Sequence, residues 1–122
     1  MTTDLRQRLG LTGERLAAEH FARLGFDVLR RRHRTRFGEI DLIVADCRLI
    51  VFVEVKTRRQ GSGQPWDALH PRKQLQVRRM AAAWLAEEQD RPRARELRFD
   101  AVGVVIDARD RLVSLEHLQA AF

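Results

Sequence analysis

Two apolar, β-branched segments, residues 39–45 and 49–56, carry charged side chains at positions where a core strand would have none. A short polar stretch separates the segments, and this arrangement predicts a β-hairpin. Side chains alternate between the two faces of a strand, so Glu54 and Lys56 share one face of the second segment. Asp41 lies in the middle of the first segment. The hairpin therefore predicts two carboxylates and an ammonium group at one place.

The hydrophobic pattern favours one register for this hairpin. If the turn pairs Asp46 with Leu49, then Asp41 lies directly opposite Glu54, and apolar residues face each other nearer the turn. A slip by one residue would set Asp41 against Val53 and bury it on the wrong face of the sheet. We therefore expect the two carboxylates to meet at the open end of the hairpin.

Two carboxylates directly across a strand pair lie roughly 5 Å apart at Cβ and repel each other unless a proton or a cation lies between them. A hard divalent ion, most naturally Mg²⁺ and alternatively Mn²⁺, satisfies such a pair and keeps waters for a phosphate substrate. Lys56 would stabilise charge on the scissile phosphate or orient an attacking water. Glu14 is a third acid, on a helical stripe that faces the sheet. We expect Asp41, Glu54 and Glu14 to hold the metal and, with Lys56, to form the catalytic site.

Each of these charges also has a simpler interpretation. A Glu-x-Lys pair at a strand end is often a surface ion pair worth under about 1 kcal/mol. Asp41 could pair with a neighbouring arginine, and Glu14 could complement the dipole of its helix. Acids that arrive from two strands and a helix in apolar surroundings favour a functional cluster, because buried charges need partners.

The elements that position these residues follow the order α-β-β-β-α-β-β, which predicts an α/β fold with a mixed sheet flanked by helices. The first helix follows Thr12, a predicted N-cap, and ends at Gly25. A short strand is expected at 26–29 and ends where a cationic run, residues 30–36, begins. Residues 58–65 are expected to form a loop. The other elements are the hairpin strands, a helix that begins at Pro71 and ends by residues 90–92, and strands at 97–106 and 112–115.

Length and composition limit the class of protein. The 122 residues have room for one domain, expected to span residues 1–122. No apolar run approaches about 18 residues and the first residues lack a signal-peptide layout, so no membrane partner is expected. A single cysteine, Cys47, excludes a disulfide within the chain, and together these features predict a cytoplasmic protein.

The charge balance favours a polyanionic partner. The sequence has 23 Lys and Arg against 17 Asp and Glu, a net charge of +6, and all the cationic residues except Lys56 and Lys73 are arginine. The planar fork of arginine suits phosphate oxygens, so we expect a nucleic acid, and the alternative is scattered solvated charge.

Several polar residues that flank the predicted site are expected to contact backbone phosphates without reading base sequence. Two of them open the second helix, whose free N-terminal amides could hold a phosphate. Lys73 shares a helical stripe with Val77, Ala81 and Trp84, which indicates that it points towards the sheet; the alternative is an ammonium group in solvent above an apolar stem. For each arginine the alternative is ordinary solvated surface. The predicted nucleic-acid contacts are Arg32, Arg34, Arg36, Arg58, Arg59, Lys73 and Gln74.

The hairpin reads Gly38-Glu39-Ile40-Asp41-Leu42-Ile43 and then Val51-Phe52-Val53-Glu54-Val55-Lys56-Thr57-Arg58. This motif resembles the YraN family, which has no assigned function and is similar in turn to archaeal Holliday-junction resolvases and the wider PD-(D/E)XK nuclease superfamily. The resemblance spans nearly the whole chain and includes Gly13-Glu14, Pro71-Arg72-Lys73-Gln74, Arg98-Phe99-Asp100 and the tail from His117 to Phe122.

By this resemblance Asp41, Glu54 and Lys56 match the D…E-x-K signature, and Glu14 matches the helix glutamate of the resolvases. Ile40 stands where the superfamily nominally has a proline. The resemblance implies a restriction-endonuclease-like core, with a four-stranded mixed sheet between helices, and Mg²⁺-dependent cleavage of phosphodiester bonds.

We therefore expect an endonuclease-like protein that cleaves DNA, branched or single-stranded, with a metal-activated water. A homodimer is compatible with the same resemblance, because resolvases pair to address two strands. The alternative is a catalytically silent basic module of the same fold that binds nucleic acid or serves as a scaffold.

Overall fold

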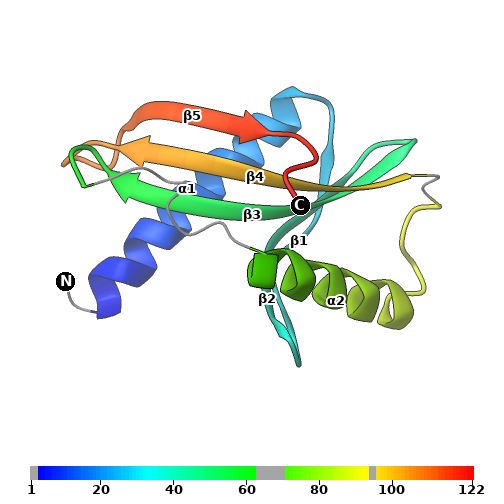
Figure 1. The fold of residues 1–122 in the computed structure, drawn as a ribbon. Coiled ribbons are helices and arrows are strands. Elements are labelled where there is room, and N and C mark those ends of the chain that lie inside the picture. Colours follow the sequence, from blue (N-terminus) through cyan, green and yellow to red (C-terminus); the bar gives the residue numbers. More distant parts are fainter. Residues whose placement is uncertain (1–2, 63–70, 94–95) are drawn as a thin grey trace.

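A computed structural model of the chain describes residues 3–62, 71–93 and 96–122, and its elements follow the predicted order (Figure 1). The fold is a mixed α/β arrangement of a five-stranded sheet and two helices. No helix among the described residues is both long and apolar enough to cross a membrane. The elements are α1 (Thr3–Arg23), β1 (Asp27–Thr35), β2 (Gly38–Ala45), β3 (Leu49–Arg59), α2 (Pro71–Glu87), β4 (Glu96–Ile106) and β5 (Leu112–Leu118).

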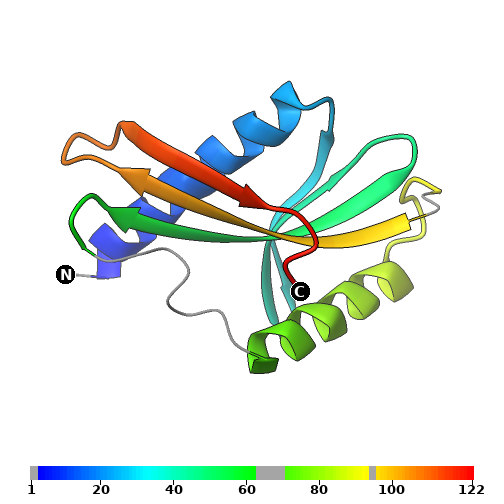
Figure 2. The same ribbon diagram turned by 45° about the horizontal axis from the view of Figure 1, so that its top comes forward.

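The strands lie side by side in sequence order, β1-β2-β3-β4-β5. Only β3 and β4 run parallel, because the segment that joins them contains α2 and returns the chain to the same end of the sheet. The other neighbouring pairs are antiparallel. Figures 1 and 2 show α1 and α2 on opposite sides of the sheet, as predicted for a sheet flanked by helices.

Alternation along β2 and β3 supplies both halves of the core. Leu42 and Val44 are buried against α1 in a cluster that includes Phe21. Ile43 and Phe52 point to the other face and are buried against α2, in a cluster that includes Trp84. A sheet covered on both faces explains why these strands read as continuous apolar runs in the sequence.

The start of the first helix differs from the prediction. The helix begins at Thr3 rather than after Thr12, and Thr12 lies in its interior, where Oγ1 donates to the Arg8 carbonyl at 3.0 Å. A threonine can bond back to the preceding turn, so a residue type that favours N-caps does not require one. The helix ends where predicted, since Gly25 adopts a left-handed φ of +95°.

Two cationic segments predicted to be irregular are strands. The run 30–36 was expected to end the first strand, but β1 continues to Thr35, and β3 continues to Arg59 instead of giving way to a loop at residue 58. β1 is an edge strand with much of its surface exposed, and charged side chains are well tolerated there. Residues 60–62 follow β3 as a turn, in agreement with the predicted loop, and the rest of that loop, 63–65, lies outside the described residues. β5 is longer than predicted and α2 shorter.

The helix α1 packs very closely on β3 at one glycine. A Cβ built on Gly13 would lie 1.7 Å from Oγ1 of Thr57, which is buried. Any larger residue would push helix and strand apart. Gly13 therefore sets how near the next residue, Glu14, comes to the sheet.

A buried polar network joins the end of α1 to the last two strands. Asp100 is fully buried and accepts two hydrogen bonds from Arg98, both at 2.8 Å, and one from the Ala120 N–H. A carboxylate only accepts, so Nε2 of His117, 2.7 Å away, donates to Asp100. Nδ1 of His117 is then left to accept from Nε2 of His20 at 3.0 Å.

The substitution Gly13→Ala is expected to lower the free energy of unfolding by about 1–3 kcal/mol, because the added Cβ forces helix and strand apart. Gly10→Ala is the matched control in the same helix, since a Cβ there meets no atom within 4 Å. That change is expected to raise the free energy of unfolding by about 0.5–1 kcal/mol. Urea unfolding measures both, and changes of the same sign would contradict the close contact.

Acid is expected to weaken the fold through His20. Burial lowers the pKa of His20 below its usual 6.5, helped by His117 and Arg23. The unfolded chain thus takes up this proton first, and stability present above pH 6.5 is lost as the pH falls towards the folded value. Urea midpoints compared between neutral and mildly acidic pH should fall more for the wild type than for His20→Gln. Equal falls would show that His20 does not contribute.

Candidate functional site

The hairpin adopts the predicted register near its turn. The Asp46 N–H donates to the Leu49 carbonyl at 3.0 Å, and Ile43 lies opposite Phe52. The paired residues of β2 and β3 end at Leu42 and Val53, one pair before Asp41 and Glu54. Beyond that point the backbones are linked by a side chain.

That side chain is Asp41, whose Oδ2 accepts a hydrogen bond from the Val55 N–H at 2.8 Å. Asp41 is partly buried, and the neighbouring Glu54 is buried with 5% of its surface exposed. The carboxylate of Asp41 therefore lies where β2 leaves β3, fixed to the strand that carries Glu54 and Lys56.

Three acids meet at this place. One carboxylate oxygen each from Glu14, Glu39 and Asp41 lie within 4.8 Å of one another, and we call this set the acid cluster. Glu14 arrives from α1, and the other two arrive from β2. Glu39 was not among the predicted site residues; its position two residues before Asp41, on the same face of the strand, was the available signal.

Glu54 has different partners from those predicted. Its Oε1 lies 3.1 Å from Lys56 Nζ and 3.2 Å from Lys73 Nζ, so two ammonium groups share one carboxylate oxygen. Lys73 comes from α2 and points towards the sheet, in agreement with the helical stripe on which it was placed. The structure thus brings Glu14 and Asp41 together with Glu39, and gathers Glu54, Lys56 and Lys73 beside them.

Burial raises the pKa of two acids of the cluster. It raises the pKa of Asp41 to about 8, and the charge of Glu54 adds to the rise, against the hydrogen bond from Val55. Burial also raises the pKa of Glu14, with Arg32 opposing the change and the charges of Glu39 and Glu54 adding to it. Both shifts come first from loss of solvent and then from the neighbouring carboxylates.

Arg32 supplies part of the missing positive charge. It has a left-handed φ of +51°, which is uncommon for a residue other than glycine, and the register of β1 with β2 places it opposite Asp41. Its Nε lies 3.7 Å from Glu14 Oε2 and 3.5 Å from Glu39 Oε1. Arg32 was predicted as a phosphate contact, and in this structure its guanidinium faces two acids of the cluster.

The other predicted phosphate contacts fall into two groups. Arg34 lies 3.6 Å from Glu39, and Arg59 is held at 2.8 Å by Asp110. The remaining three have no acidic partner among residues 3–62, 71–93 and 96–122. They are Arg36, whose guanidinium lies over the Phe37 ring, Arg58, which donates to the Thr57 carbonyl, and Gln74, which is exposed.

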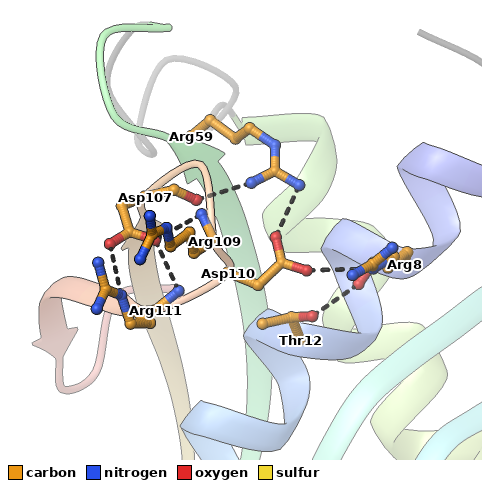
Figure 3. Close-up of polar contacts among 7 residues, drawn as sticks. All are labelled: Arg8, Thr12, Arg59, Asp107, Arg109, Asp110 and Arg111. Carbon is orange, nitrogen blue, oxygen red and sulfur yellow. Dashed lines mark hydrogen bonds and ion pairs between the residues drawn. The ribbon is translucent and has the colours of Figure 1, made fainter.

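Figure 3 shows how Arg59 is fixed. Besides Asp110, it bonds the Asp107 carbonyl at 2.8 Å. Asp110 also accepts from Arg8 of α1 at 3.1 Å, and the bond from Arg59 is the largest cause that lowers the pKa of Asp110. The turn between β4 and β5 thus fastens the first half of α1 to the end of β3.

The donor set fits the metal expected from the sequence. The ligands of the acid cluster are all carboxylate oxygens, which Mg²⁺ and Mn²⁺ prefer. Oxygens that share one Mg²⁺ at about 2.1 Å can lie up to about 4.2 Å apart. The spacing in the cluster is therefore close to what a single ion requires.

The fold and the site define a small mixed α/β protein with an acid cluster where β2 leaves β3 and two lysines beside it. The chain belongs to the uncharacterised protein family UPF0102, whose model matches residues 13–104. It is 44% identical over 118 residues to a UPF0102 protein of Nocardia farcinica, covering 96% of this chain and 91% of that protein. It is 46% identical over 121 residues to one of Mycobacterium avium, covering 97% and 92%.

Two carboxylate substitutions are expected to change stability in opposite directions when a chelator is present. Asp41→Asn keeps an oxygen for the Val55 N–H but removes an acid from the cluster, so the free energy of unfolding should rise by roughly 1–2 kcal/mol. Glu54→Gln leaves Lys56 and Lys73 without their shared anion and should lower it by about 1–3 kcal/mol.

Urea unfolding in EDTA at mildly alkaline pH measures both effects. Glu19→Gln is a suitable control, because Glu19 lies on the exposed side of α1 in an ordinary ion pair with Arg15. An Asp41→Asn protein less stable than the wild type would show that the cluster carries no excess charge.

Proposed function

We propose that this chain is a divalent-metal-dependent nuclease that hydrolyses phosphodiester bonds of DNA. The observation that carries the proposal is the acid cluster, in which Asp41 is held beside Glu14 and Glu39 with a pKa raised to about 8. Such a group is stabilised by a proton or by a cation, and perturbed carboxyls of this kind concentrate at functional sites. The D…E-x-K resemblance of Asp41, Glu54 and Lys56 supports the same reaction.

Each residue has a definite task in this proposal. Glu14, Glu39 and Asp41 would hold the ion, which when bound supplies a Lewis acid for the phosphate and lowers the pKa of a water. Lys56 and Lys73 present positive charge where the phosphate gains negative charge. Glu54 is a positioning residue, because one of its oxygens orients both ammonium groups.

The surroundings of the site suit a polyanionic substrate. The net charge of +6 attracts nucleic acid, and Arg36 and Arg58 have no acidic partner among the described residues. Arg36 lies in the turn between β1 and β2, which projects past α2 in Figure 1. A DNA strand whose backbone reaches the acid cluster would pass close to this hairpin.

The test is a cleavage assay with end-labelled duplex, single-stranded and four-way-junction DNA, in Mg²⁺, Mn²⁺ or EDTA. We expect cleavage that depends on the ion and falls at least about a hundredfold in Asp41→Asn, because loss of one charge-stabilising group costs that much. Calorimetric titration with Mn²⁺ should show weaker binding for Asp41→Asn and for Glu14→Gln.

Glu19→Gln controls for loss of a carboxylate on α1 outside the cluster and should cleave as the wild type does. DNA binding without cleavage under any of these conditions would overturn the nuclease and favour a silent binding module of the same fold. Cleavage by the Asp41→Asn protein at the wild-type rate would show that the reaction does not take place at the acid cluster.

A further inference from the structure

We propose that a cavity beside the acid cluster binds an unpaired nucleotide of the DNA strand being cleaved. This inference rests on the proposed function and names the class of its substrate. The cavity has a volume of about 520 Å³ and lies between the first half of α1 and the last residues of β3. Leu9, Gly10 and Val55 form its apolar part.

The cavity is continuous with the site. Glu14, a member of the acid cluster, and Lys56, which contacts Glu54, both line its wall. A group that fills the cavity is therefore next to the place where the phosphate would react. The two positions are close enough to be occupied by parts of one nucleotide or of two consecutive nucleotides.

Positive charge surrounds the cavity. Arg6, Arg58 and Arg59 all line it, and Arg59 is held in place by Asp110 (Figure 3). Neither Arg6 nor Arg58 has an acidic partner within residues 3–62, 71–93 and 96–122. Two guanidinium groups are thus available for an anionic ligand, and guanidinium groups favour phosphate oxygens.

Gly10 keeps the cavity open. A glycine inside a helix costs roughly 0.5–1 kcal/mol relative to alanine. At Gly13 the close contact with Thr57 explains this cost, but at Gly10 a Cβ would meet nothing within 4 Å. Packing does not explain Gly10, whereas a ligand that occupies the space in front of it does.

An unpaired nucleotide has an apolar part and an anionic part, which match the apolar lining of the cavity and the arginines around it. Its base is flat and apolar enough for the part lined by Leu9 and Val55, and its phosphate suits Arg6 and Arg58. In a duplex the base is stacked inside the helix and cannot enter a side pocket unless it is flipped out. The preferred DNA should therefore carry unpaired nucleotides, as in a single strand, a flap or an open junction.

The experiment measures binding rather than cleavage, in EDTA, by fluorescence anisotropy. The probes are a labelled thymidine oligonucleotide of about 12 residues and a duplex of equal length. We expect the wild type to bind the single strand about tenfold more tightly than the duplex, which is the scale of one base contact. Gly10→Phe, which fills the cavity, should lose this preference. Leu11→Phe should keep it, because Leu11 is exposed on the same helix and does not line the cavity.

Circular dichroism and urea unfolding show whether Gly10→Phe is folded, and Leu9→Gln, which makes the apolar part polar, is a second variant with the same expected loss. Thymidine monophosphate should compete for the single strand better than inorganic phosphate does. Three results would overturn the proposal of a nucleotide site: equal competition by phosphate, equal affinity of the wild type for both DNA forms, or a Gly10→Phe protein that binds as Leu11→Phe does.

The two proposals fail separately. Single-strand binding that depends on Gly10 without any cleavage would refute the nuclease and leave the nucleotide site. Metal-dependent cleavage that is the same in Gly10→Phe and Leu11→Phe would refute the nucleotide site and leave the nuclease.

Discussion

Repulsion between carboxylates at the point where β2 leaves β3 is the constraint on which the site depends. The backbone ladder ends at Leu42 and Val53, and the next link is the hydrogen bond from Val55 to the Asp41 side chain. Two lysines and an arginine stand around the acids, and burial still raises the pKa of Asp41 to about 8. The fold therefore carries an electrostatic cost at one place, and its two hydrophobic clusters offset that cost elsewhere.

Much of this arrangement was predictable from local patterns. The positions of the charged residues in the apolar runs of β2 and β3 predicted the register near the turn, because a slip by one residue would have set Asp41 against Val53 and buried it on the wrong face. The stripe that includes Lys73 correctly placed its ammonium group towards the sheet, where it reaches Glu54. These predictions succeeded because each depends only on how side chains repeat along one helix or strand and on which face of that element is buried.

The remainder depends on contacts between elements that no local pattern encodes. The role of Glu39 follows from the parting of two strands, and the pairing of Glu54 with two lysines depends on how α2 docks. The extent of β1 was missed because a run of arginines reads as a loop, although an edge strand tolerates it. The length of α1 was missed because two glycines and a threonine resemble a helix boundary. In the structure Gly13 contacts β3, Gly10 lines a cavity, and Thr12 bonds to the preceding turn.

The contact at Gly13 links the charge of the site to the seating of a whole helix. Glu14 reaches the cluster because α1 docks on β3 at Thr57, one residue away. A side chain that widened this contact would therefore withdraw a carboxylate from the cluster as well as separate the helix from the sheet. The composition of the site is in this way set by the size of a residue that contributes no side chain to it.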